Sequence, residues 1–421
     1  MKIWLLNASE QLAFTGSKRR RMRTGLLARA LIVRGHDVTW WKSTFEHVSK
    51  SHYRKADGFE QVESGLTIGW IHTQGYRGHV SLKRFFDHLQ IGAKFGSLAN
   101  KRRAPDIIVC SFPIPDICLA GVHYGRKKDI PVVVDVRDWW PDAFVFNLNR
   151  RLRYLANFAF SPYRSVIGSA FTRATAITGI TEPFVDWGVT KAGRTRSLRD
   201  RAFPHGYEVP VLTEREQSTA RKYWEGLGVP QDGSSFVVSF IGSLTRTFDF
   251  LPIIESVRRL EREGKSIKLV LCGDGDRITQ IRKATKALKN VVITGEWVGP
   301  GHIRELLKRS SIGIVPLPDR PDFLSTINNK TIEYLSAGVP IIVAPKNSLV
   351  SKMVKAEHCG VTCSGNEEEE FSRILGDLVE DPGRLEDMAL NAKNLFDRRF
   401  VASKVYGEFA DYIESFANSL G

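Results

Sequence analysis

The feature that constrains this chain most is a regular alternation of apolar, strand-like runs with amphipathic, helix-like stretches. In the first half the apolar runs are short and bounded by Gly, Pro or charged residues, which is typical of buried strands. The expected strands are 2–7, 36–41, 66–72, 106–111, 131–138 and 175–181, and the expected helices are 20–34, 80–103, 115–127 and 150–172. Strands separated by helices in this way favour a parallel sheet with helices on both faces, a doubly wound α/β fold.

The second half of the chain repeats the same alternation. The expected strands are 235–243, 267–275, 290–297, 311–317 and 341–343, and the expected helices are 249–264, 276–288, 300–310 and 331–335. A polar, charged stretch at 208–234 lies between the halves and is predicted to be a linker. Because 421 residues are too many for one hydrophobic core, we predict two domains, residues 1–210 and 211–400.

The segment NNKTIEYLSAGVPIIV, residues 328–343, carries the most specific local signal. Gly338 stands where a helix C-cap glycine belongs and Pro340 prevents continuation, so a short helix leads directly into a buried strand. Lys330 and Glu333 are three residues apart at the helix start and share one face. A helix N-terminus at the carboxyl edge of a parallel sheet binds anions, so the segment indicates an anion site with a carboxylate beside it. A surface helix with one ion pair is the alternative on spacing alone.

The positive charge of the chain is confined to its first half. Residues 1–210 hold 33 Lys and Arg and 17 Asp and Glu, whereas residues 211–421 hold 28 and 29. The net charge of +15 therefore comes entirely from the first half, which is expected to face an anionic partner. Nucleic acid, an anionic membrane and a polyanionic acceptor are the candidates.

Three further features of the sequence bear on membrane spanning, export and metal binding. No run of about 18 uncharged apolar residues occurs, so no spanning helix is expected. The N-terminal residues MKIWLLNASEQL have too short an apolar run for a signal peptide and predict a first strand. The five cysteines lack metal-ligand spacing, so we expect reduced, buried thiols, a cytoplasmic location and no metal site.

The order of the motifs LCGDG (271–275), NVVITG (290–295) and NNKTIEYLSAGVPIIV resembles the family 4 glycosyltransferases of the GT-B fold, most firmly over residues 235–345. The resemblance implies two Rossmann-like domains facing across a cleft, with the acceptor on the N-terminal domain and a nucleotide-sugar donor on the C-terminal one. It also implies that the closing helix, 401–421, crosses back to the N-terminal domain. The implied activity is transfer of a sugar with retention of configuration, without a metal or another cofactor.

In the C-terminal half the resemblance can be transferred residue by residue. Glu333 matches the glutamate that usually binds the nucleotide ribose, while the partner glutamate eight positions earlier falls on Ser325. Asn329 and Lys330 match the NK…EY version found in members that build cell-surface polysaccharides. This match places Lys330 near the diphosphate of the donor.

The loop FIGSLTRTFDF, residues 240–250, follows the first strand of the second half, where the family has a glycine and then a basic residue. Gly242 and Arg246 stand at those places, and Arg246 is the expected clamp for the leaving diphosphate. An exposed loop arginine is the alternative. The resemblance thus implies as donor-binding residues Gly16, Gly242, Ser243, Gly273, Ser325, Asn329 and Glu333, and as catalytic residues Arg246, Lys330 and Asp138.

Two segments of the first half are candidates for further contacts with the donor, the acceptor or membrane phosphates. The loop after the first strand contains Gly16, which would let the backbone approach the donor, followed by Lys18 and Arg19 for phosphates of acceptor or membrane. A solvated basic helix start is the alternative for these cations. The segment VDVRDWWPD follows a parallel strand, and there Asp138 is expected to orient the acceptor hydroxyl and Arg137 to bind an anion. An internal Arg–Asp pair is the alternative.

Residues 81–103 and 149–164 interleave Lys and Arg with Phe, Leu and Tyr, a composition that suits an interfacial helix on anionic lipid. Packing of the apolar residues in the core is the alternative. We expect a mixture, with the apolar side chains packed inward and the cations facing lipid headgroups. The chain is therefore expected as a peripheral protein at the inner face of the cytoplasmic membrane.

Together with the resemblance, these observations predict a retaining glycosyltransferase that moves a sugar from a nucleotide-sugar donor to a lipid-linked glycan in cell-surface polysaccharide biosynthesis. A GT-B-fold sugar-nucleotide epimerase would explain the nucleotide site but not the basic half. A nucleic-acid-binding protein would explain the charge, but no recognisable nucleic-acid module occurs, so no such partner is expected. A catalytically inactive GT-B scaffold is the third alternative, because Ser325 replaces a glutamate.

Overall fold

A computed structural model describes residues 1–13, 20–47, 49–78, 81–365 and 367–417. Its contacts divide the chain into two compact units. Unit 1 comprises Met1–Gly206 with Ala402–Gly421, and unit 2 comprises Tyr207–Val401. The units join at 206–207, close to the predicted boundary at 210, and the closing segment belongs to unit 1.

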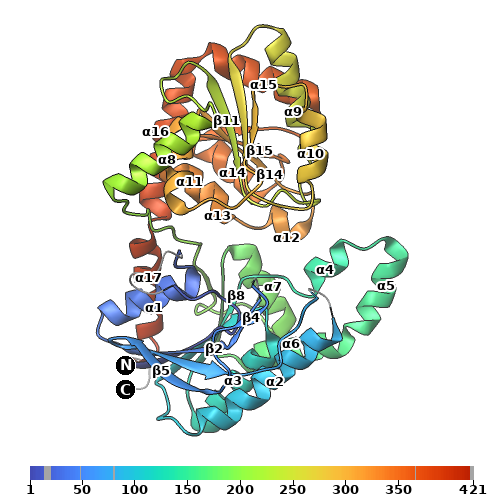
Figure 1. Cartoon of the computed structure of the whole chain (residues 1–421). Helices are drawn as coiled ribbons and strands as arrows, with labels where there is room; N and C mark the ends of the chain where they lie inside the picture. The colour runs from blue at the N-terminus through green and yellow to red at the C-terminus, as the bar shows by residue number, and fades with distance from the viewer. Residues whose placement is uncertain (14–19, 48, 79–80, 366, 418–421) are drawn as a thin grey trace. The chain divides into compact units, whose positions relative to one another are not determined.

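Unit 1 is built on an eight-stranded sheet (Figure 1). Its strands are β1 (Lys2–Leu6), β2 (Asp37–Ser43), β5 (Gly58–Glu63), β6 (Leu66–Ile71), β7 (Ile107–Phe112), β8 (Val132–Val136), β9 (Ala176–Gly179) and β10 (Arg201–Ala202), while β3 (Phe45–Glu46) and β4 (Ser51–His52) pair separately. The strand order is β10-β9-β8-β7-β1-β2-β6-β5, and only the edge pair β5–β6 is antiparallel. The order reverses between β1 and β7, and such a switch point leaves a crevice at the carboxyl ends of the strands.

The helices of unit 1 include one from the far end of the chain. They are α1 (Arg23–Val33), α2 (Leu82–Ala99), α3 (Pro115–Lys128), α4 (Asp142–Phe146), α5 (Arg150–Ala159), α6 (Ser161–Arg173), α7 (Glu182–Ala192) and α17 (Ala402–Glu414). The C-terminal helix α17 packs beside α1 (Figure 1). Phe409 stacks on Phe203 with ring centroids 4.3 Å apart, and Arg34 donates a 2.7 Å hydrogen bond to Asp411. The final helix is therefore an integral part of the first unit.

Unit 2 is built on a fully parallel six-stranded sheet. Its strands are β11 (Phe236–Ile241), β12 (Ile267–Cys272), β13 (Val291–Ile293), β14 (Ile312–Pro316), β15 (Ile341–Ala344) and β16 (Gly360–Thr362). Their order, β13-β12-β11-β14-β15-β16, is the Rossmann order, with its switch point between β11 and β14. Its helices are α8 (Glu214–Gly226), α9 (Leu251–Arg262), α10 (Ile278–Thr285), α11 (Pro300–Arg309), α12 (Pro321–Leu324), α13 (Asn329–Ser336), α14 (Leu349–Ala356), α15 (Glu368–Glu380) and α16 (Pro382–Arg399).

Both faces of each sheet are covered by apolar side chains, because successive residues of a strand point to opposite faces. In β1, Trp4 and Leu6 join one core cluster, whereas Ile3 and Leu5 join the cluster on the other face. That second cluster includes side chains from α1 and α17. The same division into two clusters holds in unit 2. Each unit is therefore a sheet with one apolar core on each face.

Two local predictions were wrong. The helix expected over 150–172 is divided into α5 and α6, because Pro162 stands in the first turn of α6 and cannot continue the hydrogen bonding of α5. The stretch 208–234, predicted to be a linker, contains α8, whose start is fixed by a capping box between Thr213 and Glu216. Among the helices of the described residues, none is long and apolar enough to cross a membrane.

Candidate functional site

The loops that follow β11 and β12 in unit 2 touch each other backbone to backbone. The Gly242 amide donates to the Cys272 carbonyl at 3.0 Å, and the Leu244 amide donates to the Asp274 carbonyl at 2.8 Å. Gly242 and Gly273 have φ angles of +141° and +151°, which side chains disfavour. The two predicted glycines therefore lie together at the carboxyl ends of β11 and β12, and we call the two loops around them the glycine rim.

Gly273→Ala should destabilise the protein by about 3 kcal/mol or more, because the added Cβ would lie 1.9 Å from the Gly242 carbonyl oxygen. Urea unfolding measures the change. Gly226→Ala, at the end of α8, is the matched control, since a Cβ there meets nothing within 4 Å. The control should be neutral or slightly stabilising, by up to about 1 kcal/mol. Equal effects of the two substitutions would show that the contact between the loops is not required.

Lys330 lies on this rim, in the first turn of α13. Its Nζ is 3.9 Å from the ring centroid of Phe240 and 4.3 Å from that of Phe248. A Cβ built on Gly242 would lie 3.1 Å from the same Nζ, so the ammonium group and the glycine are neighbours. Burial lowers the pKa of Lys330 to about 7, and the nearby Glu333 carboxylate opposes this shift only in part. The two ring faces attract the cation but replace little of its lost hydration.

The helix that carries Lys330 is fixed firmly to the sheet. The Tyr334 hydroxyl donates to the Ser239 carbonyl at 2.9 Å and accepts from the Ile241 amide at 3.0 Å. Gly313 of β14 leaves space for the Tyr334 ring, which a Cβ there would meet at 2.6 Å. At the helix start, the Asn328 side chain accepts from the Thr331 amide at 3.0 Å. The N-terminus of α13 is thus held at the switch point between β11 and β14.

The other predicted donor residues occupy different environments. Glu333 is buried, with 8% of its surface exposed, one turn after Lys330 on α13. Arg246 lies in the loop after β11, but its guanidinium pairs with Asp276 at 3.4 Å and its side chain is 79% exposed. Asn329 is the first residue of α13 and is partly buried. The contacts thus join Lys330 with the glycine rim, while the charge of Arg246 is directed to a carboxylate.

Ser243 and Ser325 lie in neighbouring parts of the same unit. Ser243 follows Gly242 in the rim loop and is partly buried. Ser325 follows α12, and its amide donates to the Pro321 carbonyl at 3.1 Å. Gly16, Lys18 and Arg19 lie outside the described residues.

In unit 1 the carboxyl end of β8 is organised by Asp135, which the sequence reasoning did not select. The Arg23 guanidinium donates two hydrogen bonds of 2.9 Å to the Asp135 carboxylate, and Arg137 Nε donates a third of 2.8 Å. Thr178 donates a fourth of 2.9 Å. Burial alone would raise the pKa of Asp135, but the two guanidinium groups hold it well below its usual range.

Arg137 connects Asp135 to a second carboxylate that was also missed. Its Nη1 donates to Glu10 at 2.8 Å, and Glu10 in turn accepts from the amides of Thr24 at 3.0 Å and Gly25 at 2.9 Å. Glu10 therefore neutralises the N-terminus of α1. The alternative interpretation of Arg137 as part of an internal Arg–Asp pair describes these contacts, with Asp135 as the aspartate. Asp138, one of the three predicted catalytic residues, follows Arg137 and is exposed.

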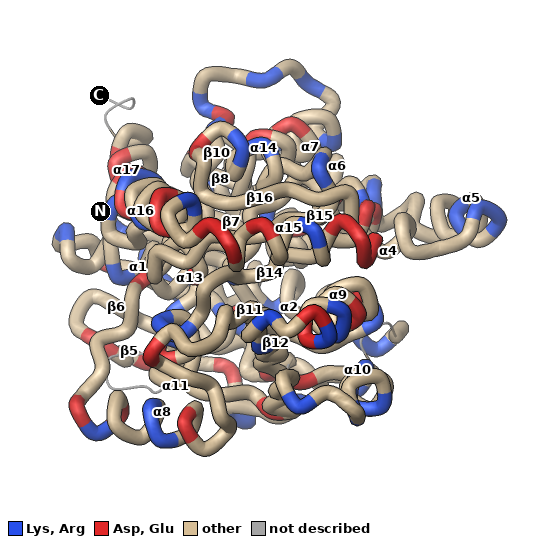
Figure 2. The backbone as a smooth tube through the Cα atoms, turned by 90° about the horizontal axis from the view of Figure 1, so that it is seen from above, with Lys and Arg blue, Asp and Glu red and all other residues tan. Residues whose placement is uncertain are grey.

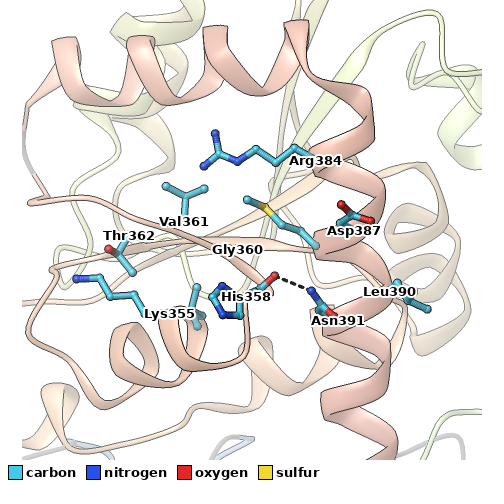
Figure 3. A pocket seen from close by; sticks show the side chains of 11 residues that line it. Lys355, His358, Gly360, Val361, Thr362, Arg384, Asp387, Leu390 and Asn391 are labelled. Atoms are coloured by element: carbon cyan, nitrogen blue, oxygen red, sulfur yellow. Dashed lines mark hydrogen bonds between the residues drawn. The ribbon is translucent and has the colours of Figure 1, made fainter.

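A cavity of about 580 Å³ lies in another part of unit 2, between α14, β16 and α16 (Figure 3). In the view, Arg384 of α16 lies above it and Lys355 of α14 below it. The Asn391 side chain donates to the His358 carbonyl at 3.2 Å. None of the predicted site residues lines this cavity. The predicted donor-binding residues of unit 2 lie elsewhere, around Lys330 and Gly242.

Known proteins resemble this chain in sequence and in fold. Residues 235–381 match the family described as "Glycosyl transferases group 1". No curated protein matches the chain significantly. Among solved structures, sucrose-phosphate synthase from Thermosynechococcus elongatus aligns with 99% of this chain and 99% of its own, with a TM-score of 0.71 and 13% identity.

Two further solved structures are similar over the same extent. Anabaena HepE in complex with UDP and glucose aligns with 99% of this chain and 100% of its own, with a TM-score of 0.67 and 15% identity. WaaG, a glycosyltransferase involved in lipopolysaccharide biosynthesis, aligns with 98% of this chain and 99% of its own, with a TM-score of 0.63 and 12% identity. The chain thus has the GT-B fold, and the predicted fold class is confirmed. Within that fold, residues 235–381 carry the sequence pattern of group 1 glycosyl transferases.

Proposed function

We propose that this protein transfers a sugar from a nucleotide-sugar donor to a hydroxyl group of a glycan acceptor, with retention of configuration and without a metal. The observation that carries the proposal is Lys330, held over two aromatic rings beside Gly242 at the switch point of a Rossmann sheet. The match of residues 235–381 to group 1 glycosyl transferases supports the reaction class. HepE, which is similar in fold, has been solved in complex with UDP-glucose.

In this reaction Lys330 would stabilise the leaving diphosphate. When the bond between the sugar and the diphosphate breaks, negative charge grows on the leaving phosphate. A cation that is already desolvated stabilises this charge more strongly than one in water, because no hydration shell must be removed. The N-terminus of α13 adds positive partial charge at the same edge. Side chains and backbone would thus supply the stabilisation that a metal supplies elsewhere.

The remaining steps of the sugar transfer follow from retention of configuration at the anomeric carbon. The acceptor hydroxyl would attack the anomeric carbon on the face from which the diphosphate leaves, and its proton would pass to the departing phosphate. Glu333, one turn after Lys330, would accept hydrogen bonds from the ribose of the donor. Arg246 would join the clamp if a diphosphate displaced Asp276 from its guanidinium. In this proposal unit 1 holds the acceptor, a lipid-linked glycan of cell-surface polysaccharide biosynthesis.

A donor screen tests the proposal directly. The purified protein is incubated with a panel of UDP-, GDP-, ADP- and dTDP-sugars, and release of nucleoside diphosphate is measured with and without EDTA. We expect slow release from one donor class that EDTA does not reduce. Recovery of an epimerised sugar nucleotide would favour the epimerase. No turnover of any donor, together with tight binding to DNA, would contradict the proposal.

The donor reaction should depend on pH through Lys330. The ammonium form is the acid form, so it predominates below pH 7 and is lost above it. We therefore expect kcat/KM for donor turnover to fall about tenfold per pH unit above about pH 7. Lys330→Arg, whose guanidinium stays charged, should flatten this part of the profile. A wild-type profile that stays level up to about pH 9 would contradict the assignment.

A further inference from the structure

Helix α5 lies in unit 1 without burying any of its residues. Its large apolar side chains are exposed, by 46% for Leu152, 69% for Tyr154, 68% for Leu155 and 84% for Phe158. A helix of a folded domain normally turns such residues toward a core. The expectation that the apolar residues of this segment pack inward was therefore wrong, and within the described residues this face has no covering element.

The N-terminal part of α2 extends the exposed apolar surface. Leu82, Phe86 and Leu89 recur at helical spacing and are 76%, 63% and 55% exposed, while Phe95 further along is fully buried. Phe85, on the neighbouring side, contacts Phe160 at the junction of α5 and α6, with ring centroids 6.3 Å apart. We define the docking face as the exposed residues Leu82, Phe86, Leu89, Leu152, Tyr154, Leu155 and Phe158.

Aromatic contacts hold α5 in its position. Phe160 packs edge to face against Trp140 at 5.6 Å and against Phe144 at 5.8 Å. At the other end of α5, the Arg153 guanidinium donates to the carbonyls of Phe146 at 2.9 Å and Leu148 at 2.8 Å. The helix is thus braced at both ends although none of its own residues is buried.

The charge on the α5 part of the docking face has one sign. Between Asp142 and Glu182 the sequence contains five arginines and no acidic residue. Three of these arginines are on α5, which Figure 2 shows in blue without red. Among the described residues, no carboxylate forms an ion pair with Arg150, Arg151 or Arg153. Exposed apolar side chains are therefore combined here with uncompensated positive charge.

We propose that the docking face inserts its apolar side chains into the surface of an anionic lipid bilayer, with the α5 arginines at the depth of the headgroups. An interfacial helix needs both properties, apolar area to bury and cations that meet anionic lipid. A nucleic acid would neutralise the arginines but leave the leucines and phenylalanines in water. A second copy of the chain would cover the apolar residues but bring like charges together. Of the three partners, only an anionic bilayer would both bury the apolar side chains and neutralise the arginines.

The position of α5 in the sequence gives the docking a consequence for the proposed reaction. Helices α4 to α6 connect β8 to β9, directly after the segment that contains Asp135 and Arg137. This connection leaves the sheet at the carboxyl end of β8. Lipid contact at α5 would therefore hold that end of β8 near the membrane, where a lipid-linked acceptor is found. The lipid contact itself does not depend on the donor chemistry.

Vesicle sedimentation tests the proposal with the full chain. We expect binding to vesicles of phosphatidylcholine mixed with phosphatidylglycerol, weaker binding in high salt and little binding to phosphatidylcholine alone. Leu155→Asp should weaken binding at least about tenfold. Leu198→Asp is the matched control, because Leu198 is 99% exposed in the same unit and outside the docking face. Arg150→Gln with Arg151→Gln should weaken binding about 25-fold, since each surface charge contributes about fivefold.

Three results would overturn the proposal. The first is that the wild-type protein does not bind anionic vesicles, the second is that it binds neutral vesicles equally well, and the third is that Leu155→Asp and Leu198→Asp change vesicle binding by the same amount. A dimer that Leu155→Asp abolishes, without any vesicle binding, would assign the face to a second copy instead. Circular dichroism establishes that the variants are folded. Release of nucleoside diphosphate without lipid should be unchanged in Leu155→Asp, so a failed docking test and a failed donor test remain distinguishable.

Discussion

Replacing Lys330 with methionine should lower kcat for donor turnover by about 10²–10³-fold, the usual cost of removing one preorganised group that stabilises developing charge. Methionine has a similar length and a flexible apolar side chain, so it can occupy the space over Phe240 and Phe248. The substitution therefore removes the charge and keeps the packing. Single-turnover release of nucleoside diphosphate measures the effect.

The unfolding temperature of Lys330→Met shows whether a loss of turnover is caused by a loss of folding. The depressed pKa of Lys330 means that its charged form is disfavoured in the folded state, so Lys330→Met should unfold at the same temperature as the wild type or above it. Lys352→Met, an exposed lysine on α14, is the control and should retain full turnover. If Lys330→Met turned over its donor at the wild-type rate, the leaving-group clamp would have to be sought elsewhere, first at Arg246.

The fold could be predicted because its signals are local. Short apolar runs alternating with amphipathic stretches are enough to indicate parallel sheets, and the βαβ order appeared in both halves. Helix α8 was missed because its composition is polar, although the Thr213–Glu216 capping box was visible in the sequence. The break at Phe160 was missed because helical periodicity was given more weight than Pro162.

The site could be predicted only in part, because its properties arise from contacts between distant segments. The spacing of Lys330 and Glu333 indicated an anion site at a helix start. It could not show that the ammonium group lies over Phe240 and Phe248, which come from β11 and the loop after it. Burial, which the spacing of the motif does not reveal, lowers the pKa of this lysine.

Asp135 illustrates a signal that was present but was not used. It is a single carboxylate within the apolar run VVVDV, and an aspartate at such a position is almost never buried without a partner. The partner could not be identified from the sequence, because Arg23 is 112 residues away. The sequence could thus have indicated a buried ion pair at β8, but only the fold shows which guanidinium groups complete it.

Asp135→Asn should destabilise the protein by about 3–5 kcal/mol, because it leaves the buried Arg23 and the largely buried Arg137 without their shared counter-charge. The amide has nearly the same shape as the carboxylate, so the effect is electrostatic rather than steric. Urea unfolding at neutral pH measures it. Asp37→Asn, an exposed aspartate on β2, is the control and should change the unfolding free energy by less than about 0.5 kcal/mol.

The pH dependence of the same pair of variants tests the cause. Because the folded-state pKa of Asp135 is depressed, its contribution to stability is complete above the pKa of the unfolded chain, near 4, and is lost as the pH falls below it. Wild-type protein should therefore lose stability on acidification faster than Asp135→Asn, and the two unfolding curves should approach each other at low pH. Curves that stay the same distance apart would mean that packing, and not the charge on Asp135, holds Arg23 and Arg137 in place.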